Sequence, residues 1–211
     1  AFRYAYEPFV FNNSKEKGSK ALYAKAMKYF IIVSMLAFLV VVFYMDILKY
    51  IINSNYWDGL KVVPIVMAAE IFMGIYFNLS FWYKLIDKTI YGAWFSFAGC
   101  AVLFLVNIIF IPHISYMACA WGGFAGYGTA MILSYVVGQR INPIPYPLRS
   151  IGVYVAITIL FYVAMELQPE TWPVALRLGI NTLIIFAFIG HIIYHDFPLR
   201  NLPVVGKYFR Q

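Results

Sequence analysis

Charged residues are scarce in this chain: they make up 12% of its 211 residues, whereas hydrophobic residues make up 63%. Soluble domains carry roughly 25% charged residues. This shortage of charge excludes an ordinary soluble domain and indicates an integral membrane protein. The 16 Lys and Arg residues outnumber the 9 Asp and Glu residues, but they are scattered between apolar runs and do not form the single basic face that nucleic acid requires. We therefore expect no nucleic-acid partner.

Cysteine and histidine are also rare. The 2 cysteines, Cys100 and Cys119, lie inside apolar runs, so we expect neither a disulfide framework nor a metal site. Of the 3 histidines, His191 and His195 are four residues apart on an expected helix, and His113 lies in an expected turn. Zinc sites take three or four ligands, and no acid or cysteine completes such a set here. We expect no cofactor.

The sequence lacks the usual signatures of a catalytic site. It contains no phosphate-binding glycine loop and no G-x-S-x-G motif. A membrane enzyme needs several polar groups that converge on one place, and the polar groups here are few and dispersed. The sequence favours transport over enzymatic catalysis, so we predict that the protein is not an enzyme.

Long apolar runs dominate what is present. A run of about 20 residues, at about 1.5 Å per residue in a helix, crosses the hydrocarbon core of a bilayer. The prediction is an all-α, polytopic transmembrane helix bundle with mixed or proline-rich loops at 46–61 and 138–148 and a short turn at 112–113. We expect six spans, at residues 27–45, 62–83, 91–111, 114–137, 149–167 and 173–194.

The fourth run carries small residues at every fourth position. Such a stripe lets the backbone of a second helix approach closely, and we interpret it as a packing surface. A role of its glycines in substrate binding is the less favoured alternative. The stripe consists of Ala118, Gly122, Gly126, Ala130 and Ser134.

Glu70 is the only acidic or basic residue of the run 62–83. Charges inside a membrane are costly and usually face a protein interior or a water-filled cavity. Glu70, Gly74 and Asn78 recur at i, i+4 and i+8, so they lie on one side of the expected helix. We predict that this side lines a cavity and that Glu70 binds and releases a proton or cation. The alternative is a structural carboxyl group that hydrogen-bonds to a neighbouring helix.

The cations are distributed unevenly over the two sides that six spans define. One of the two sides carries only three cations, Lys49, Lys61 and Arg177. The positive-inside rule then predicts that both ends of this chain are cytoplasmic. The cation-rich side contains Arg3, Lys15, Lys17, Lys20, Lys25, Lys28, Lys84, Lys88, Arg140, Arg149, Arg200, Lys207 and Arg210.

Residues 1–11 are aromatic and resemble the end of a membrane helix whose beginning is absent. Arg3 and Glu7 are spaced i, i+4 and can pair on a helix. An arginine is also suited to bind phosphate. We expect this segment to belong to a longer protein.

Several segments carry a family resemblance. They are FRYAYEPF (2–9), YWDGLKVVPI (56–65), GIYFNLSFWYKLIDKT (74–89), NIIFIP (107–112) and PIPY (143–146). Together they resemble the C-terminal half of bacterial polysaccharide biosynthesis proteins of the O-antigen flippase type, which belong to the superfamily of multidrug, oligosaccharidyl-lipid and polysaccharide exporters. The resemblance covers residues 1–147, which we expect to be part of a bundle, while 148–211 are expected to add two spans and a tail.

The resemblance implies a transporter of about 12 to 14 helices that rocks between inward- and outward-open states. Its implied substrate is a polyprenyl-pyrophosphate-linked oligosaccharide, a precursor of lipopolysaccharide, O-antigen or capsule, flipped across the bacterial inner membrane. The implied partners are membrane lipid and an N-terminal helical bundle of the same protein. Glu70 departs from the family pattern, in which an uncharged residue is usual. The residues that the resemblance assigns to substrate binding are Arg3, Glu7, Tyr76, Asn78 and Lys84.

Three other functions remain open from the sequence. A multidrug exporter of the same superfamily would have an anionic cavity for cationic drugs. A membrane-embedded transferase of glycan assembly would need acids and bases that this chain does not supply. A purely structural membrane partner would place Glu70 in a packed interface.

Overall fold

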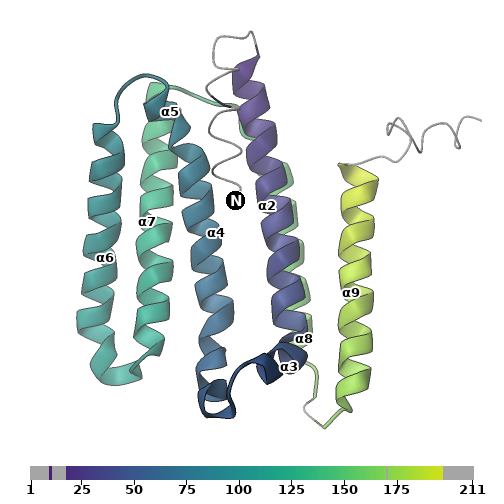
Figure 1. Ribbon diagram of the computed structural model, residues 1–211. Helices are drawn as coiled ribbons and strands as arrows, with labels where there is room; N and C mark the ends of the chain where they lie inside the picture. The colour runs from purple at the N-terminus through teal and green to yellow at the C-terminus, as the bar shows by residue number, and fades with distance from the viewer. Residues whose placement is uncertain (1–9, 11–17, 170, 197–211) are drawn as a thin grey trace, which may run out of the picture. The chain divides into compact units, whose positions relative to one another are not determined.

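A computed structural model describes residues 10, 18–169 and 171–196 of the chain (Figure 1). These residues are helical apart from short connections, and no strand occurs among them, which confirms the predicted all-α fold. The elements are α2 (Ser19–Phe43), α3 (Met45–Leu48), η1 (Lys49–Ile51), η2 (Ser54–Val62), α4 (Val63–Leu79), α5 (Phe81–Lys84), α6 (Ile90–Ile114), α7 (Met117–Ile141), α8 (Leu148–Glu166) and α9 (Val174–His195).

Five helical segments of the described chain are long and apolar enough to cross a membrane, so the protein is a multi-pass membrane protein. α7 has the same length as α6, 25 residues, but glycine and polar residues interrupt its apolar sequence. The five segments are Ser19–Phe43, Ser54–Lys84, Ile90–Ile114, Leu148–Glu166 and Val174–His195.

The turn predicted at residues 112–113 is wrong. α6 continues through Pro112 to Ile114, and the chain reverses at Ser115, whose φ is 49°. A proline removes one backbone donor, and in the last turn of a helix this loss affects a single hydrogen bond. α7 therefore begins at Met117 and ends at Ile141, later than the predicted range 114–137.

The predicted run 62–83 is divided at Ser80. The Ser80 hydroxyl donates to the backbone oxygen of Phe77 at 2.7 Å, and Ser80 separates α4 from α5. The residues before this run, 46–61, were expected to form a mixed loop and instead form the short helices α3, η1 and most of η2. Hydrophobic runs indicate where a helix crosses the membrane but not how the interfacial segments fold.

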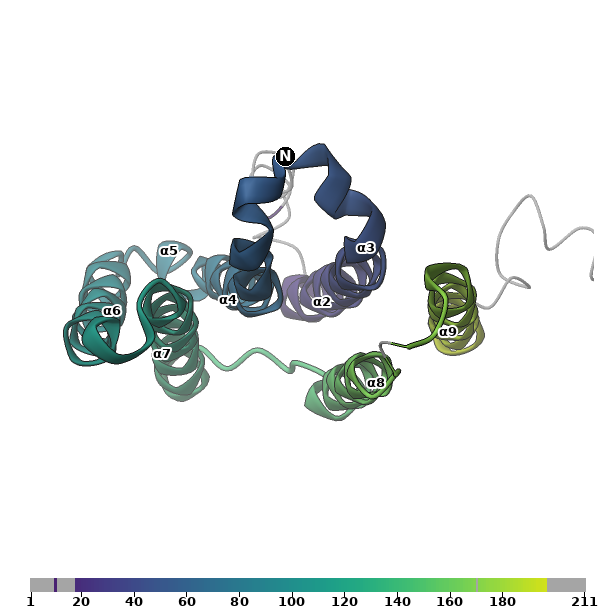
Figure 2. The ribbon, with the colours of Figure 1, turned by 90° about the horizontal axis from the view of Figure 1, so that it is seen from below.

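The helices group into two compact units. The first unit comprises Ala1–Ile31 and Asp58–Leu148, and its described part contains α4, α5, α6, α7 and the first half of α2. α7 packs against both α4 and α6, and these helices lie side by side in two perpendicular views (Figures 1 and 2). The second unit comprises Ile32–Trp57 and Arg149–Gln211 and contains the second half of α2, α3, α8 and α9. The predicted division at residue 147 stays a prediction.

The small-residue stripe of α7 is a packing surface, as predicted. Ala118, Ala130 and Ser134 are at most 5% exposed. A Cβ atom placed on Gly126 would lie 2.8 Å from the backbone oxygen of Gly99 in α6, and a Cβ atom on Gly99 would lie 2.8 Å from the oxygen of Gly126. Only glycine allows the two backbones to approach this closely.

Candidate functional site on α4 and α5

Glu70 lies near the middle of α4, and its side chain is exposed. Val66 and Met73, at i−4 and i+3 from Glu70, are also exposed, by 39% and 40%. Residues at these spacings share one face of a helix. We call Val66, Glu70 and Met73 the open face of α4, because the described residues leave them uncovered.

The next two residues on the predicted polar side, Gly74 and Asn78, lie against other parts of the first unit. A Cβ atom on Gly74 would overlap the ring of Phe30 in α2, so this ring packs directly against the backbone of α4 at Gly74. Asn78 is 5% exposed, and its amide nitrogen donates to the backbone oxygen of Gly74 at 2.9 Å. The predicted polar side is therefore divided, with Glu70 outside and Asn78 inside the first unit.

Asn78 retains one polar atom that the described residues do not satisfy. Its amide oxygen Oδ1 is buried and accepts no hydrogen bond from them. A buried unsatisfied acceptor destabilises a protein, so its presence calls for a partner such as water or a substrate hydroxyl. The predicted role of Asn78 in binding sugar stays a prediction.

Tyr76 connects α4 to α6. It is 8% exposed, and its hydroxyl group donates to the backbone oxygen of Gly92 at 3.1 Å and lies 3.1 Å from Oγ of Ser96. Both interactions join helices of the first unit. In this conformation the hydroxyl group joins α4 to α6. The predicted contact of Tyr76 with substrate stays a prediction.

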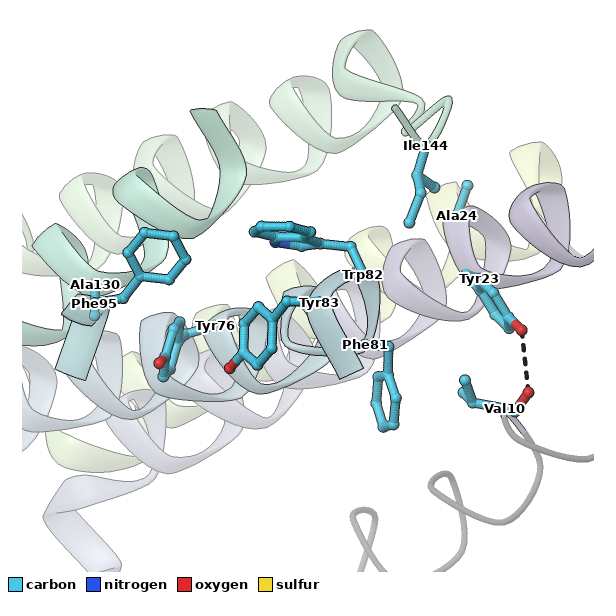
Figure 3. Packing of buried hydrophobic residues seen from close by; sticks show 10 residues of the cluster. All are labelled: Val10, Tyr23, Ala24, Tyr76, Phe81, Trp82, Tyr83, Phe95, Ala130 and Ile144. Atoms are coloured by element: carbon cyan, nitrogen blue, oxygen red, sulfur yellow. Dashed lines mark hydrogen bonds between the residues drawn. The ribbon is translucent and has the colours of Figure 1, made fainter. Parts of the chain in front are cut away.

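The aromatic residues after Tyr76 form the core of the first unit. Trp82 is 1% exposed, and its indole nitrogen donates to the backbone oxygen and the hydroxyl oxygen of Ser134 at 3.1 and 3.3 Å. Gly138 makes room for this ring, since its Cβ atom would lie 2.7 Å from the indole nitrogen. Figure 3 shows the cluster, which consists of Val10, Tyr23, Ala24, Tyr76, Phe81, Trp82, Tyr83, Phe95, Ala130 and Ile144.

Lys84 ends α5 and lies against aromatic rings. Its ammonium group is 5.1 Å from the ring centroid of Phe77 and 5.0 Å from that of Phe81. Aromatic faces attract cations at such distances, so these rings hold the charge at the end of the helix. Arg3 and Glu7, the other predicted substrate-binding residues, lie outside the described residues.

Sequence reasoning missed a polar network in the second unit. Asn181 of α9 is 3% exposed, donates to the backbone oxygen of Phe43 at 3.1 Å, and accepts a hydrogen bond from the Gln168 amide at 2.8 Å. Arg177 lies 3.5 Å from the carboxylate of Asp46. Phe43 ends α2, so Asn181 satisfies a carbonyl that the helix leaves without an intrahelical partner.

The available signal for this network was the presence of amide and guanidinium side chains in the apolar run 173–194. Within a membrane helix such residues usually hydrogen-bond to another helix. Gln168 is near Asn181 in the chain, but Phe43 and Asp46 lie more than 130 positions before their partners, which no local pattern identifies. Tyr44 and Thr182 add a further hydrogen bond of 2.7 Å between their hydroxyl groups.

No family model, curated protein or solved structure matches this chain. Within the described part of the chain, no three His, Cys, Asp or Glu residues are grouped to hold a metal ion. The site offers an exposed carboxyl group on a membrane-spanning helix and a cation at the end of the same segment. Such groups can exchange a proton or cation and attract an anion.

Proposed function

We propose that this chain forms part of a transporter that moves polyprenyl-pyrophosphate-linked oligosaccharide across the bacterial inner membrane by alternating access. The observation that carries the proposal is the exposed carboxyl group of Glu70 on the membrane-spanning segment Ser54–Lys84. The resemblance of the segments around 56–65 and 74–89 to oligosaccharide flippases supplies the substrate class.

The physical argument concerns what Glu70 faces in the membrane. A carboxyl group exposed to lipid is strongly unfavourable, and ionisable residues of membrane helices usually face a water-filled cavity or a protein partner. On this proposal a further helical bundle stands opposite the open face of α4 and encloses an aqueous chamber. The chamber then opens alternately to each side of the membrane.

Glu70 couples transport to an ion in this scheme. The carboxyl group takes up a proton or cation when the chamber faces the outer side and releases it towards the cytoplasm. Arg3 and Lys84 attract the pyrophosphate group, because guanidinium and ammonium groups bind phosphate oxygens. Tyr76 and Asn78 are buried in this conformation, so on this proposal they contact the sugars in a state of the transport cycle that uncovers them, and Glu7 contributes to substrate binding.

A multidrug exporter is the second candidate, and the negative charge of Glu70 favours it. An anionic chamber selects amphipathic cations, whereas a flippase chamber needs net positive charge for pyrophosphate. The two candidates differ in what they move: only a flippase restores surface glycan in a cell that lacks its own flippase. Drug resistance without surface glycan would favour the exporter.

The test is a Glu70→Gln exchange in the full-length protein, expressed in cells that depend on it for surface glycan. We expect glycan export to lose its dependence on external pH, because the amide cannot titrate. Asp58→Asn is the matched control, since Asp58 is an exposed acid of the same unit that lies within η2, before α4 begins. An unchanged pH profile in the Glu70→Gln protein, with normal membrane insertion, would remove Glu70 from the mechanism.

A further inference from the structure

Two histidines lie together at the end of α9. His191 is half-buried, His195 is exposed, and their ring centroids are 4.5 Å apart. Residues four positions apart share one face of a helix, so the helix itself brings the two rings together. We call these two residues the histidine pair. The proposed transport mechanism does not use it.

The histidine pair lies at the contact between α9 and α8. The ring of Tyr154, a residue of α8 that is 1% exposed, has its centroid 5.4 Å from that of His191, and the two rings meet edge to face. The hydroxyl group of Tyr154 donates to the carboxylate of Asp196, the residue that follows His195. Tyr154 therefore contacts α9 in two ways, and one of them is a histidine ring.

Aromatic rings make much of the remaining contact between these two helices. The ring centroid of Phe188 in α9 lies 6.1 Å from that of Tyr154 and 6.3 Å from that of Phe161. A Cβ atom on Gly152 of α8 or on Gly190 of α9 would meet nothing within 4 Å, so these glycines mark no close approach of the two backbones. Because side chains make the contact, a change at one ring can loosen it.

Among the described residues, few other ionisable groups lie near the histidine pair. α8 supplies Tyr154, and the exposed Arg149 lies at the start of that helix. The end of α9 supplies Asp196 and Tyr194, whose ring centroid lies 5.0 Å from one of the histidine rings. The part of α2 that belongs to the same unit, 32–43, contains no ionisable residue. The carboxylate can offset one positive charge on the pair but not two.

Protonation makes this arrangement depend on pH. An imidazole group changes its charge between about pH 5 and 8. When both rings carry a proton, two positive charges lie one ring contact apart, and like charges at such a distance repel each other. Water and salt screen partly buried charges less than exposed ones, so the half-buried position of His191 preserves much of this repulsion.

We propose that the histidine pair is a proton sensor that maintains the contact between α8 and α9 near neutral pH and loosens it when both rings are charged. The repulsion acts on His191, whose ring packs against Tyr154, so it disturbs the helix contact itself. Protonated histidine clusters change interfaces in this way in other pH sensors. The pair lies in the second unit and Glu70 in the first, so the proposal does not depend on the transported substrate.

The test measures the distance between spin labels on α8 and α9 in the full-length protein by double electron–electron resonance. The labels are attached at Val153→Cys, where the side chain is 44% exposed, and at Gly190→Cys, where a Cβ atom meets nothing within 4 Å. The background lacks Cys100 and Cys119. We expect the distance to increase by about 2 Å, the size of a typical helix shift, when the pH falls from about 8 to about 5.

His195→Gln is the decisive variant. It removes one of the two charges at an exposed position and leaves His191 and Tyr154 in place. We expect the distance between the labels to be the same at both pH values in this variant. His113→Gln removes an exposed histidine of the first unit. It is the matched control and is expected to keep the full change.

Three results would overturn the inference. An unchanged distance in the protein that retains all its histidines would show that protonation does not reach the helix contact. A change that persists in His195→Gln would assign the pH dependence to another group. An equal change between labels at Leu160→Cys and Leu183→Cys, which are 63% and 69% exposed nearer the other end of the same two helices, would indicate a general loosening of the unit.

Discussion

The two units of this protein hold their helices together by different means. In the first unit, α6 and α7 meet through Gly99 and Gly126, and aromatic rings around Trp82 fill the space at one end. In the second unit, polar side chains join the elements: Asn181 donates to the backbone of Phe43, and the Tyr154 hydroxyl group donates to the carboxylate of Asp196.

This difference reflects the limited means by which helices associate in lipid. Lipid chains are as apolar as leucine, so hydrophobicity alone does not bring membrane helices together. Close backbone packing and hydrogen bonds between helices remain. The first unit uses both, since Tyr76 and Trp82 also bond across its helices. In the second unit Gly152, Gly179 and Gly190 meet nothing within 4 Å, and hydrogen bonds join its elements. A close backbone contact is destabilised by a substitution that adds volume. A hydrogen bond between helices is destabilised by a substitution that removes one of its polar atoms.

The largest effect is expected from Trp82→Ala in the first unit. Removing a buried aromatic side chain from a packed core destabilises a protein by about 3–5 kcal/mol, and this change also removes the hydrogen bonds to Ser134. Unfolding in mixed detergent micelles measures the change in free energy. Trp94→Ala is the control, because Trp94 is 64% exposed; similar losses in both variants would contradict the assignment of Trp82 to the core.

A single methyl group at Gly126 tests the close approach of α6 and α7. Gly126→Ala places an atom 2.8 Å from the backbone oxygen of Gly99, and such overpacking costs about 1–3 kcal/mol. The same exchange at Gly123 meets nothing within 4 Å and is expected to stabilise the helix by up to about 1 kcal/mol. The two variants should therefore shift the unfolding transition in opposite directions, and a shift in the same direction would refute close packing at Gly126.

The corresponding change in the second unit is Asn181→Leu. It leaves the Phe43 carbonyl and the Gln168 amide without their hydrogen-bond partner. Hydrogen bonds between membrane helices contribute about 0.6 kcal/mol on average, so we expect a loss of about 1 kcal/mol for the two. Leu183→Ala, at a position of α9 that is 69% exposed, serves as the control. If Asn181→Leu lowers the free energy of unfolding by more than Gly126→Ala does, the expected order of the two effects is wrong.

The smallest effect is expected from the ion pair of Asp46 and Arg177, whose side chains are 27% and 24% exposed. Water and salt weaken ion pairs that are partly exposed. A double-mutant cycle with Asp46→Asn and Arg177→Gln should give a coupling energy of at most about 1 kcal/mol, smaller at high salt. A larger coupling that resists salt would place the pair in a drier environment than these exposures imply.

The sequence predicted the helical fold because each apolar run approaches the thickness of a bilayer, and it predicted the stripe of α7 because four-residue spacing is a property of the helix itself. It did not predict the turn at Ser115 or the short helices at 46–61. These depend on local hydrogen bonds and interfacial packing. The site was predicted in part: the position of Glu70 along a span follows from the sequence, but the covering of Gly74 by Phe30 depends on tertiary contacts.

The central claim, that the open face of α4 borders water inside the membrane, is tested most directly by cysteine labelling at Met73. In a background without Cys100 and Cys119, full-length proteins with Met73→Cys or Phe104→Cys are treated in membranes with a water-soluble thiol reagent, which requires the thiolate. Phe104 is 63% exposed on the apolar helix α6, where we expect lipid. We predict rapid labelling at position 73 and none at position 104. Equal protection at both positions, with labelling by a lipid-soluble reagent, would contradict the aqueous chamber.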